Sequence, residues 1–460
     1  MQNFIKNNLN LILIILIIAS ISSFLLTINL PLIGEEGVYT NAALEMMHAK
    51  QYKFATLYGN TYPRPPLYNW LIIFLTKWLG VQHIVLSARI ITLLATSFTA
   101  IALFYFSKKL ILKNNSFALL TVALFLSGDL LFKRGWLAYS DPSFALFVFC
   151  GVAWLLLGAI NNNIKYLFLA NLSIFLGFLC KTISCYLFYI TAYLILLALT
   201  EHKKFLLNKS VIFLHCGFAL LLLWVLYAVY PHVLNDLIYN ITAPKLAVTT
   251  SNTTKIINFI AWPGLIWLAF LPGSLIISYY FKIFSYKKLN GIIKLILLIT
   301  IINLAPYWFS NTNKLRYLLP LYPWFAIIFG YFIWQNQIIK PAINLLVITV
   351  IIKYITAIFW FPYEYNIKFG DAHKIAFDIL EQTKNNALYI NDPSAPGLRI
   401  AGTINQTIWP KKPLTNPPDN IKHNYFLLTD TNIATVKNNI ILIKTYYLKK
   451  SKVYLLYFTF

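Results

Sequence analysis

The feature that most constrains this chain is the recurrence of apolar runs long enough to cross a bilayer. The first, LNLILIILIIASISSFLLTINL, begins shortly after Lys6. A spanning helix needs about 20 predominantly apolar residues. Only 11% of the 460 residues are charged and 59% are hydrophobic, whereas a soluble fold has about 25% charged residues. The other runs lie near residues 84–107, 116–131, 143–160, 164–180, 183–200, 210–231, 257–280, 290–309, 316–335 and 340–362. We therefore predict an all-α polytopic membrane protein with about 11 transmembrane helices.

The connecting loops predict the orientation, because Lys and Arg near span ends favour the cytoplasm. If the N-terminus is cytoplasmic, every cytoplasmic turn carries Lys; these turns are residues 107–115, 161–165, 201–210, 281–290 and 334–340. The formal charge of +24 then reflects such loops and contacts with anionic lipids, and no nucleic-acid partner is expected. The segment 66–79 is apolar but short, so we expect an interfacial or re-entrant helix there.

The chain changes character after Glu364, where polar residues increase and no span-length apolar run remains. We predict a membrane domain at 1–363, with a first outer loop at 34–83, and a small outer C-terminal α/β domain at 364–460. Helical spacing favours a helix at 371–384 and a short one at 394–402. Alternating and β-branched segments favour strands at 387–390, 425–430, 440–448 and 452–460.

The four cysteines do not indicate a disulfide framework or a zinc site. They lie in or beside apolar runs, with no CxxC pair and no His at ligand spacing; they are Cys150, Cys180, Cys185 and Cys216. Such cysteines are typical of simple packing, and no metal ligand set is predicted.

The first outer loop carries two candidate features. Glu35 and Glu36 stand at a predicted helix entry ahead of Tyr39, and Arg64 is held among prolines in YPRPPLYNW. Each has an ordinary structural explanation: acids at a helix start complement the helix dipole, and an Arg at a span end can extend to the interface.

Two more features lie in later outer loops. Asp141 stands before a proline in SDPSF, which is also an ordinary helix start. Lys181 interrupts apolar sequence, and a charge so placed suggests function. Lys314, Arg316 and Tyr317 open another span, where the two basic residues could instead anchor a helix end.

The predicted topology brings these residues to the outer side. Arg offers a two-point contact and Lys a point charge for an oxyanion, so basic and Tyr side chains at the interface suit a phosphate attached to a lipid. An acid in that positive field stays ionised and can accept a proton from a hydroxyl. This combination is typical of group transfer from a polyprenyl phosphate.

These motifs, in this order, resemble the protein mannosyltransferase and lipid A aminoarabinose transferase superfamily. The matching segments are GEEGVY, YPRPPLYNW, SDPSF, GFLCKT and KLRYLLPLYP, and the resemblance covers roughly residues 9–335. It implies a C-type glycosyltransferase fold that uses polyprenyl-phosphate sugars, with the catalytic acid in the first outer loop.

The resemblance also implies roles for single residues. Glu35 and Glu36 match the acid pair of the family, whose first member is usually Asp, and Asp141 matches the acid of the second outer loop. Arg64 stands where the aminoarabinose transferases have Lys, preceded here by Pro63 in place of Glu. We take Glu35, Glu36 and Asp141 as candidate catalytic residues. The candidate contacts to the donor phosphate are Arg64, Lys181, Lys314, Arg316, Tyr317 and Tyr39.

The leading hypothesis is a glycosyltransferase that moves a sugar from an undecaprenyl-phosphate carrier to an outer acceptor such as lipid A, protein or cell-surface glycan. A lipid or solute transporter or flippase is the alternative, although no internal repeat supports it. A non-catalytic assembly subunit is a third possibility, against which the retained acids argue. A divalent metal near Glu35 and Asp141 stays open. The predicted location is the bacterial inner membrane, with the C-terminus and active site on the periplasmic side.

Overall fold

A computed structural model describes residues 2–229, 252–283, 289–308, 314–369, 371–384, 386–431, 439–448 and 451–459. The chain forms two compact units. The helical unit comprises residues 1–26, 92–136 and 140–355, and the mixed unit comprises residues 27–91, 137–139 and 356–460. The first outer loop therefore packs with the C-terminal residues. The predicted domain boundary between 363 and 364 stays a prediction.

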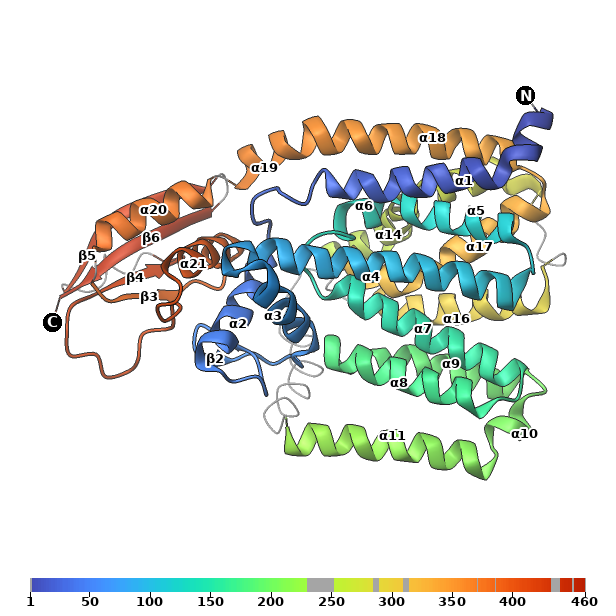
Figure 1. The fold of residues 1–460 in the computed structure, drawn as a ribbon, viewed down its shortest axis with the longest axis horizontal. Coiled ribbons are helices and arrows are strands. Elements are labelled where there is room, and N and C mark those ends of the chain that lie inside the picture. Colours follow the sequence, from blue (N-terminus) through green and yellow to red (C-terminus); the bar gives the residue numbers. More distant parts are fainter. Residues whose placement is uncertain are drawn as a thin grey trace. The chain divides into compact units, whose positions relative to one another are not determined.

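Long apolar helices make up the helical unit (Figure 1). Its principal helices are α1 (Gln2–Leu25), α4 (Ile84–Phe106, which begins in the mixed unit), α5 (Asn115–Ser127), α6 (Asp129–Arg134), α7 (Asp141–Ile160), α8 (Ile164–Cys180), α9 (Cys185–Leu199), α10 (Lys203–Leu206), α11 (Lys209–Ala228), α14 (Asn252–Ala269), α15 (Gly273–Tyr279), α16 (Gly291–Trp308), α17 (Tyr322–Gln335) and α18 (Ile339–Ile355). Short segments of other helix types also occur: η2 (Ser107–Ile111), η3 (Phe281–Ile283) and η5 (Leu315–Leu321).

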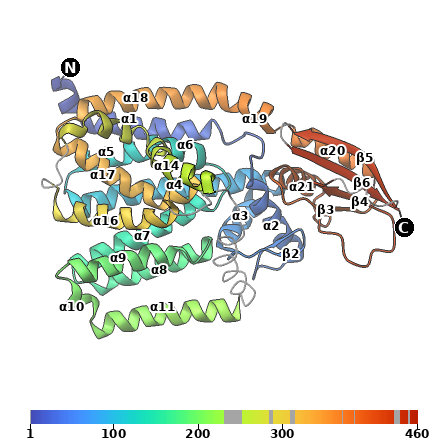
Figure 2. The same ribbon diagram turned by 180° about the vertical axis from the view of Figure 1, so that it is seen from behind.

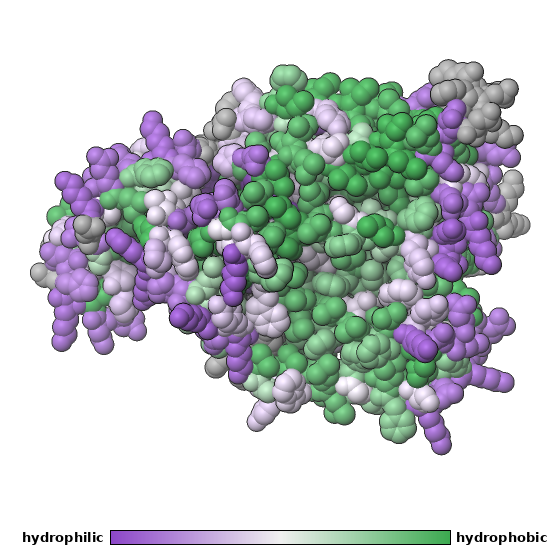
Figure 3. Space-filling view, viewed as in Figure 1, coloured by the Kyte–Doolittle hydropathy of each residue, from purple (hydrophilic) through white to green (hydrophobic). Residues whose placement is uncertain are grey.

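The predicted membrane topology is confirmed in its helical character. Seven of the described helical segments are long and apolar enough to cross a membrane, and α14 with α15 forms a bent pair that also passes. The shorter apolar helices α5, α8 and α9 coincide with the three remaining predicted spans. In Figure 3 the helical unit presents a largely hydrophobic surface, as lipid exposure requires.

One predicted span is broken. The sequence suggested a continuous helix over 257–280, but α14 and α15 meet at 106°. Pro272 lies in this break, where a proline disfavours helical backbone in the residue before it. The backbone N–H of Asp129 donates to the Leu271 carbonyl at 3.0 Å, which satisfies one of the backbone groups that the break leaves.

The helix ends show which chain segments share an end of the helical unit. The N-terminus and α10 lie at the same end of the helical unit (Figures 1 and 2). α9 connects the turn that contains Lys181 to α10. Lys181 therefore lies at the opposite end of that helix from the Lys-rich turn at 201–210. The assignment of the Lys-rich end to the cytoplasm stays a prediction.

The mixed unit combines the first outer loop with the C-terminal α/β fold. Its loop elements are α2 (Glu36–Ala49), the hairpin β1 (Thr56–Leu57) and β2 (Asn60–Thr61), α3 (Leu67–Leu79) and η1 (Val81–His83). Its C-terminal elements are η6 (Thr356–Trp360), α19 (Phe361–Phe369), α20 (Ala372–Thr383), β3 (Leu388–Asn391), α21 (Ala395–Ile408), β4 (Tyr425–Thr429), β5 (Ile440–Leu448) and β6 (Ser451–Phe458). The predicted C-terminal helices and strands are thus present, with α21 longer than the sequence suggested.

The C-terminal sheet has the order β3-β4-β6-β5. β3 pairs in parallel with β4, and the other pairs are antiparallel. Tyr425, Leu427, Ile440 and Leu456 pack with Ile421 in a buried apolar cluster on one face of the sheet. The strand order makes β5 an edge strand. The buried cluster gives the C-terminal sheet an apolar core of its own.

Candidate functional site

The turn that carries the acid pair has a backbone that favours glycine. Gly34 adopts φ +58°, and a Cβ there would lie 2.8 Å from the Tyr139 hydroxyl. Only glycine enters this left-handed region at no steric cost. α2 then begins at Glu36, with Glu35 as the residue that precedes its first turn.

Glu36 is fully buried and is paired with a residue that the sequence analysis did not select. Arg89, from the first turns of α4, donates Nε to Glu36 Oε1 at 2.9 Å and Nη2 to Oε2 at 2.5 Å. The backbone N–H groups of Ile33 and Ala138 donate to the same carboxylate, each at 2.7 Å. Both oxygens of this buried carboxylate therefore accept hydrogen bonds from groups fixed by the fold.

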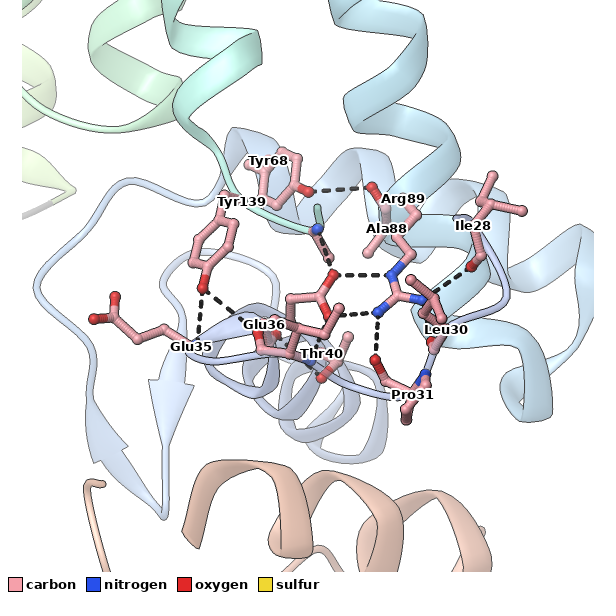
Figure 4. Close-up of polar contacts among 12 residues, drawn as sticks. Ile28, Leu30, Pro31, Glu35, Glu36, Thr40, Tyr68, Ala88, Arg89 and Tyr139 are labelled. Atoms are coloured by element: carbon pink, nitrogen blue, oxygen red, sulfur yellow. Dashed lines mark hydrogen bonds and ion pairs between the residues drawn. The ribbon is translucent and has the colours of Figure 1, made fainter. Parts of the chain in front are cut away.

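Arg89 also binds the chain segment that precedes Glu35 and Glu36 (Figure 4). Its Nη1 donates to the carbonyls of Ile28 and Leu30, and its Nη2 donates to that of Pro31. Glu36 and Arg89 thereby join three segments. These are residues 28–33, which precede α2; the first turns of α4; and the 137–139 loop. The signal that could have found Arg89 is the one that found Lys181, a lone charge within an apolar run.

Glu35 has a different environment from its neighbour. Its side chain is half-buried, and Figure 4 shows it directed away from Glu36 and Arg89. Its backbone N–H donates to the Tyr139 hydroxyl at 2.9 Å. The backbone of Glu35 is therefore fixed, while its carboxylate stands outside the Glu36–Arg89 network.

Two other predicted residues of the first loop contact each other. Arg64 Nη1 donates to the Tyr39 hydroxyl at 2.9 Å, and its guanidinium lies 5.6 Å from the centre of the Tyr62 ring. Tyr39 contacts the edges of Tyr68 and Tyr139, with ring centres 5.1 and 6.4 Å apart. An aromatic cluster therefore connects Arg64 to the turn of Glu35.

In the helical unit, Asp141 and Lys181 form a buried ion pair. Lys181 Nζ lies 2.5 Å from Asp141 Oδ1, and the two residues are 8% and 4% exposed. Asp141 begins α7, and Lys181 is the residue that follows α8, so each charge stands at the helix end whose dipole it complements. Removing one partner of such a pair typically costs about 3–5 kcal/mol.

Aromatic rings and a second cation surround this ion pair. Lys181 Nζ lies 4.8 Å from the centre of the Tyr317 ring and 5.3 Å from that of Phe144. The guanidinium of Arg316 lies 5.4 Å from the centre of the same Tyr317 ring. Lys314, which precedes η5, is exposed. Two cations with N–H donors therefore flank one aromatic ring, an arrangement that suits an oxyanion.

The structure thus brings the predicted residues together in two groups. Glu35, Glu36, Tyr39 and Arg64 lie in the mixed unit, and Asp141, Lys181, Arg316 and Tyr317 lie in the helical unit with Lys314 close in sequence. Within the described ranges no three His, Cys, Asp or Glu side chains are grouped as metal ligands would be. The site roles assigned to all nine residues stay predictions.

The arrangement defines a class of protein: a multi-pass membrane protein with two buried ion pairs, Glu36–Arg89 and Asp141–Lys181, at or near the ends of its helices. Comparison with known proteins narrows this class. The sequence profile of the dolichyl-phosphate-mannose-protein mannosyltransferase family matches residues 63–230. None of the curated protein sequences compared with the chain matches it.

Solved structures match over nearly the whole chain. The crystal structure of ArnT from Cupriavidus metallidurans bound to undecaprenyl phosphate has a TM-score of 0.72 at 11% identity, and the alignment covers 97% of each chain. The oligosaccharyltransferase AglB from Archaeoglobus fulgidus, in complex with an inhibitory peptide and a dolichol-phosphate, has a TM-score of 0.52 at 10% identity. That alignment covers 90% of this chain and 65% of AglB. The predicted fold is therefore confirmed as similar to that of ArnT and AglB.

Proposed function

We propose that this protein is a glycosyltransferase that moves a sugar from a polyprenyl-phosphate donor, of the undecaprenyl type in a bacterial inner membrane, to an acceptor on the outer side. The observation that carries the proposal is the similarity of fold along the whole chain to ArnT, whose structure holds undecaprenyl phosphate. The buried Lys181 and the partly exposed Arg316 on either side of the Tyr317 ring support it independently, because a lipid phosphate needs fixed positive charge at the membrane surface.

The reaction assigns a separate task to each group of residues. An acceptor hydroxyl attacks the anomeric carbon of the sugar, and the bond from that carbon to the phosphate oxygen breaks. The proton of the hydroxyl passes to Glu35, and the polyprenyl phosphate departs with the negative charge. Lys181 and Arg316 stabilise that charge as it develops, an effect worth about 3 kcal/mol for a single donor.

The two acids of the first loop have different roles in this proposal. Glu36 already accepts four hydrogen bonds, including a bidentate pair from Arg89, so both of its oxygens are already engaged within the protein. Glu35 stands outside that network (Figure 4). We assign the base to Glu35 and a structural role to Glu36. If the acceptor is itself an ionised phosphate, Glu35 orients the acceptor without taking a proton.

Two neighbouring substitutions test the assignment. Glu35→Gln should lower transfer by about 10²–10⁴-fold while donor binding persists, because loss of a general base has that effect. Transfer is measured as release of undecaprenyl phosphate by the protein in liposomes. Mass spectrometry of lipid A and surface glycoproteins, with and without the protein, identifies the acceptor.

Glu36→Gln is the matched control. It leaves the Arg89 charge buried without its partner, so it should destabilise the protein by about 3–5 kcal/mol and lower its apparent melting temperature. Glu35→Gln should destabilise the protein less, because the Glu35 side chain is only half-buried. Near wild-type transfer by Glu35→Gln would remove the base role from that residue. Movement of the lipid across the bilayer without release of polyprenyl phosphate would favour a flippase.

A further inference from the structure

The C-terminal helix α21 lies directly against the first turn of α2 within the mixed unit (Figures 1 and 2). A Cβ on Gly37 would lie 2.3 Å from the Leu398 carbonyl oxygen and 2.7 Å from its carbon. Backbone cannot move aside as a side-chain end can, so only glycine permits this approach. Gly37 is two residues after Glu35.

A buried amide chain fastens the next turn of α2 to the same helix. Asn41 Nδ2 donates to the Leu398 carbonyl at 3.0 Å, and Asn405 Nδ2 donates to Asn41 Oδ1 at 2.9 Å. The Leu414 backbone N–H then donates to Asn405 Oδ1 at 2.7 Å. Asn41 and Asn405 are both 0% exposed. Buried amides satisfied in series specify one relative arrangement of the elements that they join.

α21 also supports the chain before the acid pair. A Cβ on Gly402 would lie 3.2 Å from Leu32 Cδ1, so this helix packs closely on the segment three residues before Glu35. The helix therefore contacts the loop on both sides of Glu35. Arg399 of α21 also interacts electrostatically with Glu36. Burial lowers the pKa of Arg399 to about 10, and the negative charge of Glu36 opposes that decrease.

A second anchor lies at the other end of α2. Glu45, whose pKa is raised by burial, accepts from the backbone N–H of Tyr58 at 2.6 Å and of Gly59 at 3.0 Å. The Tyr58 hydroxyl donates to the Asp392 carbonyl at 3.1 Å, and Asn416 N–H donates to the Tyr58 carbonyl at 2.9 Å. α2 is thus tied to the C-terminal domain at both ends.

We propose that the C-terminal domain is a positioning element of the transferase: α21 holds α2 through Gly37, Asn41 and Asn405 so that Glu35 keeps its working geometry. The inference rests on the proposed function. It assigns the outer domain a task in the chemical step, since a misplacement of about 1 Å can cost 10²-fold in rate. Gly37, Asn41 and Asn405 act through Glu35 and do not themselves contact the substrate.

The test compares kinetics and local opening in the same variants. Asn405→Ala and Asn41→Ala should each lower kcat by about 10–100-fold with little change in the donor KM. The double variant should cost no more than the worse single one, because both residues belong to one series of hydrogen bonds that fails when either is removed. Amide hydrogen exchange of residues 38–41 should become faster in each variant, and Gly37→Ala should do the same.

Lys444→Met is the matched control in the same domain. It removes the exposed pair with Asp378, in which Lys444 Nζ lies 2.8 Å from Asp378 Oδ2, and should leave kcat and exchange in α2 unchanged. A folded Asn405→Ala protein with wild-type kcat, or one with only a raised donor KM, overturns the inference. Wild-type transfer by Glu35→Gln would instead contradict the assignment of Glu35 as the base. Unchanged amide hydrogen exchange of residues 38–41 in Asn405→Ala would by itself contradict the role of α21 in holding α2.

Discussion

At the scale of single residues, this protein compensates buried charges in two different ways. Glu36 is paired with Arg89 and also accepts hydrogen bonds from two backbone N–H groups. Asp141 is paired with Lys181, whose ammonium also faces the Tyr317 ring near Arg316. The first arrangement is surrounded by backbone donors and acceptors, whereas the second lies beside an aromatic ring and a second cation.

The pair of Asp141 and Lys181 can be tested for a role beyond structure. Lys181→Met or Asp141→Asn alone should destabilise the protein by about 3–5 kcal/mol, since each leaves one buried charge unpaired. The double variant removes both charges and should recover most of that stability. If Lys181 binds the donor phosphate, the double variant should nevertheless stay inactive. Recovery of both melting temperature and transfer would make the pair purely structural.

Arg64 allows a separate test of donor binding. Arg64→Lys keeps the charge but loses the two-point contact, so transfer should be only moderately impaired. Arg64→Ala loses both and should weaken donor binding and turnover, by about 3 kcal/mol in the transition state.

Tyr39→Phe is the control for Arg64, because it removes only the hydroxyl that Arg64 contacts at 2.9 Å. We expect a smaller loss than for Arg64→Ala in the same transfer assay. Full transfer by Arg64→Ala at low donor concentration would show that Arg64 only extends from a helix end to the interface.

At the scale of elements, α3 has two distinct faces. Tyr68, Ile72 and Thr76 are buried, whereas Phe74 and Trp78 are 64% and 78% exposed. Lys77 is exposed beside them, 5.6 Å from the centre of the Tyr52 ring. Aromatic side chains with a nearby Lys are typical of a helix that lies in the membrane interface, as the length of this segment predicted.

Spin labels at single cysteines can test that placement, in a chain whose exposed Cys216 is replaced by Ser. Labels at Phe74→Cys and Trp78→Cys should collide more with oxygen, which concentrates in lipid, than with a water-soluble nickel chelate. Tyr447→Cys is the control, because Tyr447 is an equally exposed aromatic residue, 73% accessible, on an edge strand of the outer sheet. Dominant nickel contact at positions 74 and 78 would place α3 in water.

At the scale of the whole molecule, the orientation in the membrane determines whether the proposed chemistry has access to its substrates. A reporter fused after Glu364 should be active on the outer side, and one fused at Lys203 should report the cytoplasm, because the Lys-rich turns favour that side. A tail on the cytoplasmic side would separate the mixed unit from outer acceptors and would contradict the mechanism.

Much of the architecture follows from the sequence. Apolar length predicted the helical membrane fold, and alternating and β-branched segments predicted each described strand of the C-terminal sheet. These features depend on local chemistry: a bilayer requires about 20 apolar residues per helix whatever the neighbours are. The candidate charges were found for the same reason, since scarce charges in apolar sequence are costly.

Tertiary structure alone decided which charges meet. Glu35 and Glu36 are adjacent and chemically alike, yet only Glu36 is held by Arg89, which lies 53 positions further along the chain. The docking of α21 on α2 joins residues 357 positions apart through Asn41 and Leu398. The break between α14 and α15 likewise replaced a continuous predicted span. Periodicity and composition describe single segments and whether they face lipid, water or the protein interior. The partner of a buried polar group depends on packing between distant segments, which no local pattern encodes.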